Sequence, residues 1–264
     1  ASPHAAALSL RLTALGAMDA WSVTGERVLP RSRKARAILA ILALEAPAAV
    51  PRTRLAELLW STRGDEQARG SLRQALHELQ DVLRPVGPNL IQAGRESVRL
   101  HPDQVWIDAT ALLRAVRDRP ESLDLLNAEL LADLGGLDPA FDVWLAERRQ
   151  RFREATLAAA QAALSAARLP AAIIQAARRV LAIDETQEGA WRALIRSESG
   201  RGDRAAALSA WEQCQRVFAN RFRASPSPET MALAEELRRD VALPAPVSSP
   251  GVARRPVLRG ARLG

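Results

Sequence analysis

Apolar residues recur at three- and four-residue steps through three consecutive stretches between residues 31 and 84. This spacing places the apolar side chains on one face of a helix, so the pattern predicts three amphipathic helices. Pro47 and Pro51 bracket the loop after the first helix, and residues 61–64 form a polar break after the second. Asp65 is a favourable N-cap for the third helix. The three helices are therefore expected to follow one another through short loops.

Short strands are predicted on both sides of these helices. Residues 8–15 alternate between apolar and polar, and residues 18–28 continue around a Thr-Gly turn, which predicts a small antiparallel sheet. Behind the helices, residues 90–92 and 98–100 flank a loop that contains glycine and predict a hairpin. Three helices followed by a hairpin are the order of a winged helix-turn-helix.

From Pro102 onward the hydrophobic period becomes helical and stays so. We expect helices near residues 108–118, 121–133, 142–167, 170–183, 187–199, 203–221 and 227–241. Residues 169–184 realign on residues 203–218 with an offset of 34 residues, the period of tetratricopeptide helix pairs. The predicted fold class is mainly α: an N-terminal winged helix-turn-helix, with a small β-sheet and a β-hairpin wing, precedes an all-α tetratricopeptide-like domain.

This organisation divides the chain into three parts. A winged head occupies residues 8–102, and a helical body occupies residues 103–243. Residues 244–264 are rich in Pro, Gly, Ser and Arg, which predicts a disordered basic tail or linker. The net charge is +7, and residues 1–102 carry 14 basic against 9 acidic side chains. A positive head fits a polyanion-binding domain, although an excess of this size is also common without such a role.

Sequence motifs for other classes of function are missing. The sequence contains no nucleophile elbow, Walker loop, zinc-ligand spacing or dinucleotide fingerprint, so we expect no enzyme, no metal and no cofactor. The single cysteine, Cys214, excludes a disulfide framework and reads as a small apolar residue on a helix. No apolar run approaches the roughly 20 residues of a membrane span. We therefore expect a soluble, cytoplasmic protein without a membrane partner.

The third predicted helix carries polar side chains off its apolar stripe. They are Arg69, Arg73, Gln74 and His77. The two arginines and the histidine stand at four-residue steps, so they share one face. Arg can address guanine, and Gln can address adenine, with paired hydrogen bonds in the major groove. Because Glu78 and Asp81 would repel phosphates, contact is expected in the first half to the middle of the helix. The alternative is a solvated face on which charge pairs only support the helix.

Further cations occur at predicted helix starts and at the hairpin tip. They are Arg31, Arg33, Lys34 and Arg36 in the first helix, Arg52 and Arg54 in the second, and Arg95 in the hairpin. Cations are unfavourable at the positive end of a helix dipole, so the first cluster is easier to explain if a phosphate binds there. A wing arginine could enter the minor groove. Solvated charges remain the alternative for all three groups.

Two groups of motifs resemble a known family. The stretches RSRKARAILAILALEA, RTRLAELLW and ARGSLRQALHELQDVLR resemble the OmpR-type DNA-binding domain of the Streptomyces antibiotic regulatory protein (SARP) family. The stretch AFDVWLAERRQRFREATLAAA and the later elements GAWRALI and SPSPET resemble the bacterial transcriptional activation domain (BTAD) that follows it. The resemblance covers roughly residues 8–241.

The resemblance implies a bacterial activator that binds double-stranded promoter DNA, often at direct repeats where a homodimer would bind, and that contacts RNA polymerase. In the resembling domains the loop before the third helix can meet the polymerase; here it is Ser61, Thr62, Arg63, Gly64 and Asp65. We predict a sequence-specific regulator that reads promoter DNA through the third helix. The alternative is a tetratricopeptide-like adaptor or effector-sensing protein whose winged head does not bind DNA.

Overall fold

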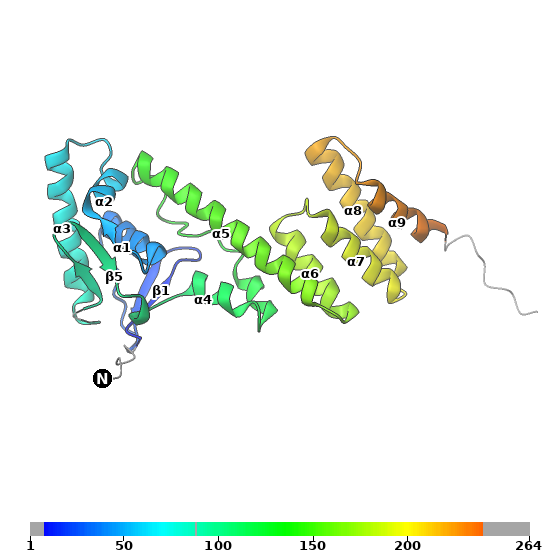
Figure 1. Cartoon of the computed structure of the whole chain (residues 1–264), viewed down its shortest axis with the longest axis horizontal. Coiled ribbons are helices and arrows are strands. Elements are labelled where there is room, and N and C mark those ends of the chain that lie inside the picture. Colours follow the sequence, from blue (N-terminus) through cyan, green and yellow to red (C-terminus); the bar gives the residue numbers. More distant parts are fainter. Residues whose placement is uncertain (1–7, 88, 240–264) are drawn as a thin grey trace, which may run out of the picture.

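The computed structural model describes residues 8–87 and 89–239, and it is an elongated molecule (Figure 1). A mixed head at one end holds the short strands and the first three helices of the chain (Figure 1). A long helix, α5 (Pro139–Ala166), runs from this head to an all-helical body at the other end. The predicted fold class, a winged helix-turn-helix followed by an all-α repeat region, is confirmed.

The first sheet of the head has the strand order β2-β1-β6. Strands β1 (Leu10–Thr13) and β2 (Asp19–Ser22) are antiparallel, as the alternating pattern predicts. Strand β6 (Val105–Ile107) adds to β1 in parallel and was not predicted, because three residues are too few to show a period. Its addition ties the chain beyond the hairpin back to the start of the head.

The three predicted helices are confirmed as α1 (Arg33–Glu45), α2 (Arg52–Leu59) and α3 (Asp65–Leu83). The apolar stripe of α3 is buried and leaves the opposite face in solvent; it consists of Ala68, Leu72, Ala75, Leu76, Leu79 and Leu83. The expected cap is wrong by one residue, because Gly64 is the N-cap and Asp65 is the first helical residue. In that position the carboxylate still complements the positive end of the helix dipole.

The hairpin wing is also confirmed. Strands β4 (Ile91–Ala93) and β5 (Ser97–Leu100) are antiparallel, and the short strand β3 (Val50–Pro51) pairs with β5. The resulting order β3-β5-β4 joins the wing to the segment that precedes α2. The wing and the start of α2 are therefore held side by side.

The helix expected over residues 121–133 is wrong. After a 3-10 turn (Pro102–Gln104) and α4 (Asp108–Ala115), the structure forms a second 3-10 turn (Pro120–Leu125) and then an irregular segment. The backbone N–H of Leu131 donates to the carbonyl of Ala14 at 2.7 Å. Arg149 of α5 donates to the carbonyls of Leu130 and Leu131. These distant partners use the backbone groups that a helix would have paired internally.

The body consists of α5, α6 (Pro170–Ile183), α7 (Glu188–Gly200), α8 (Arg204–Phe222) and α9 (Pro228–Arg239), and these five predicted helices are confirmed. Successive helices pack against one another, so α7 lies between α6 and α8 (Figure 1). The 34-residue offset in the sequence aligns α6 with α8. Among the described residues no helix is both long and apolar enough to cross a bilayer.

Two apolar cores divide the buried residues. The first core fills the head and includes Phe141, Trp144 and Leu145 from the first turns of α5. The second lies among the end of α4, the second 3-10 turn and α5 to α9, and it includes Trp191 and Trp211. The start of α5 thus packs as part of the head, although it lies nearly forty residues beyond the wing in sequence.

The buried thiol of Cys214 gives a first testable expectation. Burial raises the pKa of this thiol to about 12, so at pH 8 almost none of it is the reactive thiolate. Native protein is therefore expected to release no thionitrobenzoate from Ellman's reagent within minutes, whereas unfolding in guanidinium releases one equivalent. Fast labelling of native protein would show that α8 does not pack as described.

Candidate nucleic-acid interface

The exposed face of α3 carries the polar side chains that the sequence analysis selected. Arg69, Arg73, Gln74 and His77 are all exposed. Within residues 8–87 and 89–239, the side chains of Arg69, Arg73 and Gln74 have no hydrogen-bond or ion-pair partner. His77 Nε2 lies 3.3 Å from Asp81 Oδ2 on the same helix. The face therefore presents two guanidinium groups and an amide that are free to bind an external acceptor.

A hollow of about 780 Å³ lies between α2, α3 and the turn of the wing. Five arginines line it: Arg52 from α2, Arg63 from the loop before α3, Arg69 and Arg73 from α3, and Arg95 from the wing. Glu57, Asp65 and Glu96 share the lining, so positive charge is in slight excess. The structure thus gathers the α3 face, the start of α2 and the wing into one basic surface, which we call the α3–wing surface.

Hydrogen bonds between α2 and the wing fix the geometry of the α3–wing surface. Arg52 Nε donates to the carbonyl of Gly94 at 2.9 Å, and the Arg52 backbone N–H donates to the carbonyl of Glu96 at 2.8 Å. Arg95 is exposed at the wing tip between these two contacts, and no partner for it occurs among the described residues. Arg99 of β5 is bound by Gln92 across the hairpin at 2.7 Å. Arg54 pairs with Glu57 on α2 at 3.9 Å.

The cations at the start of α1 do not line that hollow, and most of them have partners within the chain. Arg33 donates to the carbonyls of Asp133 and Gly135, both at 2.9 Å, and Arg36 donates to the carbonyl of Pro30. Lys34 donates to the carbonyl of Leu59 and lies over the ring of Trp60. Arg31 is exposed. A phosphate at this end of α1 would have to share three of these four cations with carbonyl groups.

Lys34 also lies 3.7 Å from the carboxylate of Asp138, whose side chain is 4% exposed. Burial lowers the pKa of Lys34, and the neighbouring carboxylate partly opposes that decrease. Asp138 is the N-cap of α5 and accepts from the backbone N–H of Ala140. The start of α1 and the start of α5 are therefore joined through one partly buried ion pair.

Asp138 also holds the loop before α3. The backbone N–H of Ser61 donates to Oδ2 of Asp138 at 3.1 Å, and the Ser61 hydroxyl donates to Oδ1 at 2.5 Å. Arg63 of the same loop donates to the Ser71 hydroxyl on α3. The remaining loop residues, Thr62 and Gly64, are exposed. This role of Asp138 was not predicted from the sequence, although an Asp-Pro pair before a helix is a recognised N-cap signal.

Glu78 was expected from the sequence to repel phosphates, but in the structure its side chain binds the start of α1. Its carboxylate accepts from the backbone N–H of Ser32, the N-cap residue of α1, at 2.8 Å. The charge is therefore used to join α3 to α1, rather than being presented at the α3 face. Among the described residues no group of three His, Cys, Asp or Glu side chains is placed to hold a metal ion.

Gly70 occupies the exposed side of α3 between Arg69 and Arg73. A Cβ built at this position meets nothing within 4 Å, so packing inside the chain does not require glycine. Replacing Gly70 by alanine should raise the free energy of unfolding by about 0.5–1 kcal/mol, the usual cost of glycine in a helix interior. Urea unfolding followed by circular dichroism measures this change. A variant that is less stable than the unmodified protein would contradict the open position of Gly70.

Comparisons with known proteins address the second half of the chain and the overall fold. The profile of the family described as bacterial transcriptional activator domain matches residues 103–238, just over half of the chain. A solved structure of Mycobacterium tuberculosis EmbR in complex with a low-affinity phosphopeptide is similar, with a TM-score of 0.63 and 22% sequence identity. That similarity covers 88% of this chain but 65% of the EmbR chain, so this chain spans about two thirds of it. No curated protein matches the sequence. The family match confirms the resemblance to regulators with such a domain, and the structural similarity confirms the shared fold.

Proposed function

Because the chain belongs to the family of proteins with a bacterial transcriptional activator domain, we propose that it is an activator whose head binds duplex promoter DNA. The observation that carries the proposal is the α3–wing surface, where four arginines from α2, α3 and the wing face one hollow. An exposed helix with free donors, beside a basic wing, is suited to the major groove and the flanking phosphates. We assign residues 8–102 to DNA binding, residues 103–243 to protein contacts and residues 244–264 to a tail; the tail lies outside the described residues.

In this proposal Arg69, Arg73, Gln74 and His77 contact base edges or the groove, because they lie on the exposed face of α3. Arg52 and Arg95 bind flanking phosphates or the minor groove. Arg54 and the cluster Arg31–Arg36 contribute charge at the edges, since most of these groups already have partners within the chain. The solvated-face alternative predicts that none of these side chains affects DNA affinity.

The loop of residues 61–65 and the helical body are proposed to contact RNA polymerase. Asp138 and Ser71 restrain the loop at Ser61 and Arg63 and leave Thr62 and Gly64 exposed. A restrained loop loses little conformational entropy when a partner binds. Binding of two copies at a direct repeat belongs to the same proposal.

An electrophoretic shift on the chain's own upstream DNA, at two salt concentrations, tests DNA binding against the adaptor alternative. The proposal expects a specific complex that weakens steeply as salt rises, because bound phosphates release counterions. An unrelated duplex of equal length is the control. If no complex forms at low salt, the head does not bind that DNA, and the adaptor alternative is favoured.

A further inference from the structure

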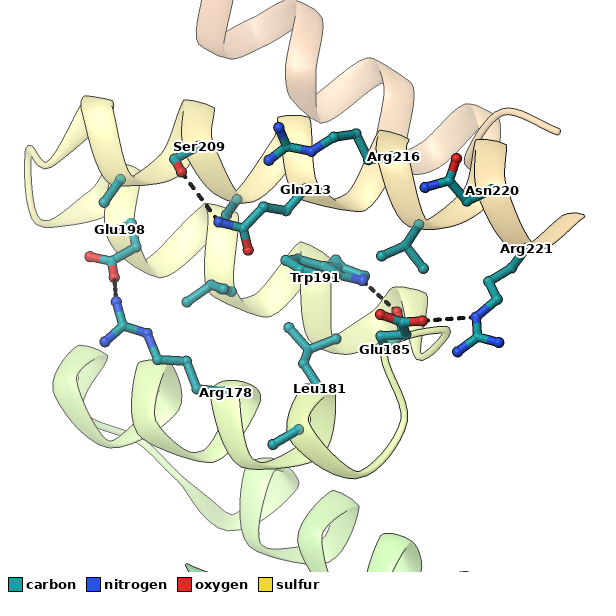
Figure 2. A pocket seen from close by; sticks show the side chains of 15 residues that line it. Arg178, Leu181, Glu185, Trp191, Glu198, Ser209, Gln213, Arg216, Asn220 and Arg221 are labelled. Atoms are coloured by element: carbon teal, nitrogen blue, oxygen red, sulfur yellow. Dashed lines mark hydrogen bonds and ion pairs between the residues drawn. The ribbon is translucent and has the colours of Figure 1, made fainter. Parts of the chain in front are cut away.

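A second hollow, of about 830 Å³, lies among the helices of the body (Figure 2). These helices lie at the opposite end of the molecule from α3 (Figure 1). Helices α6, α7 and α8 form the walls of the hollow, and apolar side chains line its floor. Leu181 comes from α6, Trp191 and Leu194 from α7, and Val217 from α8. The indole N–H of Trp191 is already used, because it donates to the carbonyl of Glu185 at 2.8 Å. The floor therefore offers apolar area and no free donor.

Polar side chains follow one wall of this groove at regular steps. Ser209, Gln213, Arg216 and Asn220 stand four, three and four residues apart on α8, so they form a row along one helix face. Figure 2 shows this row on one side of Trp191, with Leu181 on the other. From Ser209 to Asn220 the helix rises about 16 Å, which matches an extended segment of roughly five residues.

Arginine side chains outnumber carboxylates in the lining of the groove. Glu198, nearly buried, accepts from Arg178 at 2.9 Å and lies 3.8 Å from Arg201. Glu185 is bound by Arg221 at 2.8 Å. Both carboxylates that line the groove thus have arginine partners. Arg216 is exposed and has no ion-pair partner anywhere in the described ranges.

We infer that this groove binds an extended acidic peptide segment of a partner protein, with a carboxylate on Arg216 and an apolar side chain over Trp191. The unpartnered guanidinium matches a carboxylate with two parallel hydrogen bonds. The amide of Asn220 offers both donors and an acceptor, as the backbone of an extended peptide requires. Gln213 Nε2 donates to the Ser209 hydroxyl at 3.4 Å, which leaves this amide a second N–H and its carbonyl oxygen. A nucleic acid would bring charge but no apolar side chain for the floor. This inference goes beyond the proposed function and stands even if the head does not bind DNA.

Selection from a displayed library of random nonapeptides, with the whole chain as bait, tests the inference. Selected peptides are expected to be enriched about threefold or more in Asp and Glu, and to carry aliphatic residues beside them. Arg216→Glu is expected to weaken the best peptide at least about 20-fold in fluorescence anisotropy. The matched control is Arg151→Glu, the same charge change at an exposed position of α5 outside the groove; it should leave affinity within twofold.

Three results would overturn the inference. The first is selection of peptides enriched in Lys or Arg. The second is an affinity for the selected peptides that does not depend on Arg216. The third is Arg216-dependent binding of a synthetic peptide of residues 244–264 that is tighter than binding of the selected peptides. Asn220→Ala, which keeps the charge, provides a second variant if Arg216→Glu loses helical dichroism. The Arg216→Glu variant should still shift DNA like the unmodified protein. Loss of peptide binding can therefore be distinguished from loss of the proposed DNA binding.

Discussion

Replacing Arg69 and Arg73 together by alanine is expected to abolish tight, specific DNA binding. Both side chains are exposed on α3, line the same hollow and have no partner among the described residues. A bidentate contact from arginine to a base is worth about 1–3 kcal/mol, so losing two should weaken binding by roughly 2–6 kcal/mol, or at least about 30-fold. The measurement is fluorescence anisotropy on a duplex selected by the unmodified protein from random DNA.

The control for this variant removes the same charge elsewhere. Arg151 and Arg153 are exposed on α5. Their double alanine variant should bind the selected duplex within about threefold, because only long-range electrostatics changes. Because all four replaced arginines are exposed, both double variants should unfold at the same urea concentration as the unmodified protein. Equal affinity for the two variants would mean that α3 is not the reading helix.

Replacing Asp138 by alanine is expected to lower the free energy of unfolding more than any other substitution proposed for this chain. The carboxylate is buried, caps α5, accepts two hydrogen bonds from Ser61 and lies beside the half-buried Lys34. Its removal loses a helix cap, worth about 0.5–2 kcal/mol. It also leaves the donors of Ser61, whose hydrogen bonds to Asp138 are partly buried, without acceptors, at about 1–3 kcal/mol. The free energy of unfolding should fall by about 2–4 kcal/mol in urea denaturation.

The matched control is Glu147→Ala, which removes a carboxylate from an exposed position of the same helix. Its free energy of unfolding should change by less than about 0.5 kcal/mol. Asp138→Asn should lie between the two, because the amide oxygen can still cap α5 but carries no charge for Lys34. If Asp138→Ala is as stable as Glu147→Ala, the joint between head and body does not depend on this carboxylate.

The elements of the head and body could be predicted because their signals are local. The apolar stripe of α3 and the breaks on either side are contained in about twenty residues. The segment 121–133 has similar leucine spacing, yet it is not helical, because Ala14 and Arg149 bind its backbone. Both partners lie outside the segment, Arg149 18 residues beyond Leu131 and Ala14 far before it, so they leave no mark on a short sequence window.

The candidate site also combines features that the local sequence predicts with features that depend on distant segments. The exposure of Arg69 and Arg73 follows from the period of α3, so the sequence was enough to select them. Their position beside Arg52 and Arg95 depends on the pairing of β3 with β5, which only the fold supplies. The cluster at the start of α1 resembles a phosphate site in sequence because its carbonyl partners and Asp138 come from distant segments.

Directed DNA cleavage measures whether α3 enters the major groove. Because Cys214 is buried, a Gln74→Cys variant should accept an iron–EDTA cleavage reagent at its new thiol alone. If α3 lies in the groove, the conjugate should cut both strands inside the region that the unmodified protein protects, and a Gln213→Cys conjugate in the body should make no cuts there. Absence of cuts from the Gln74→Cys conjugate on DNA that it demonstrably binds would show that α3 does not enter the major groove.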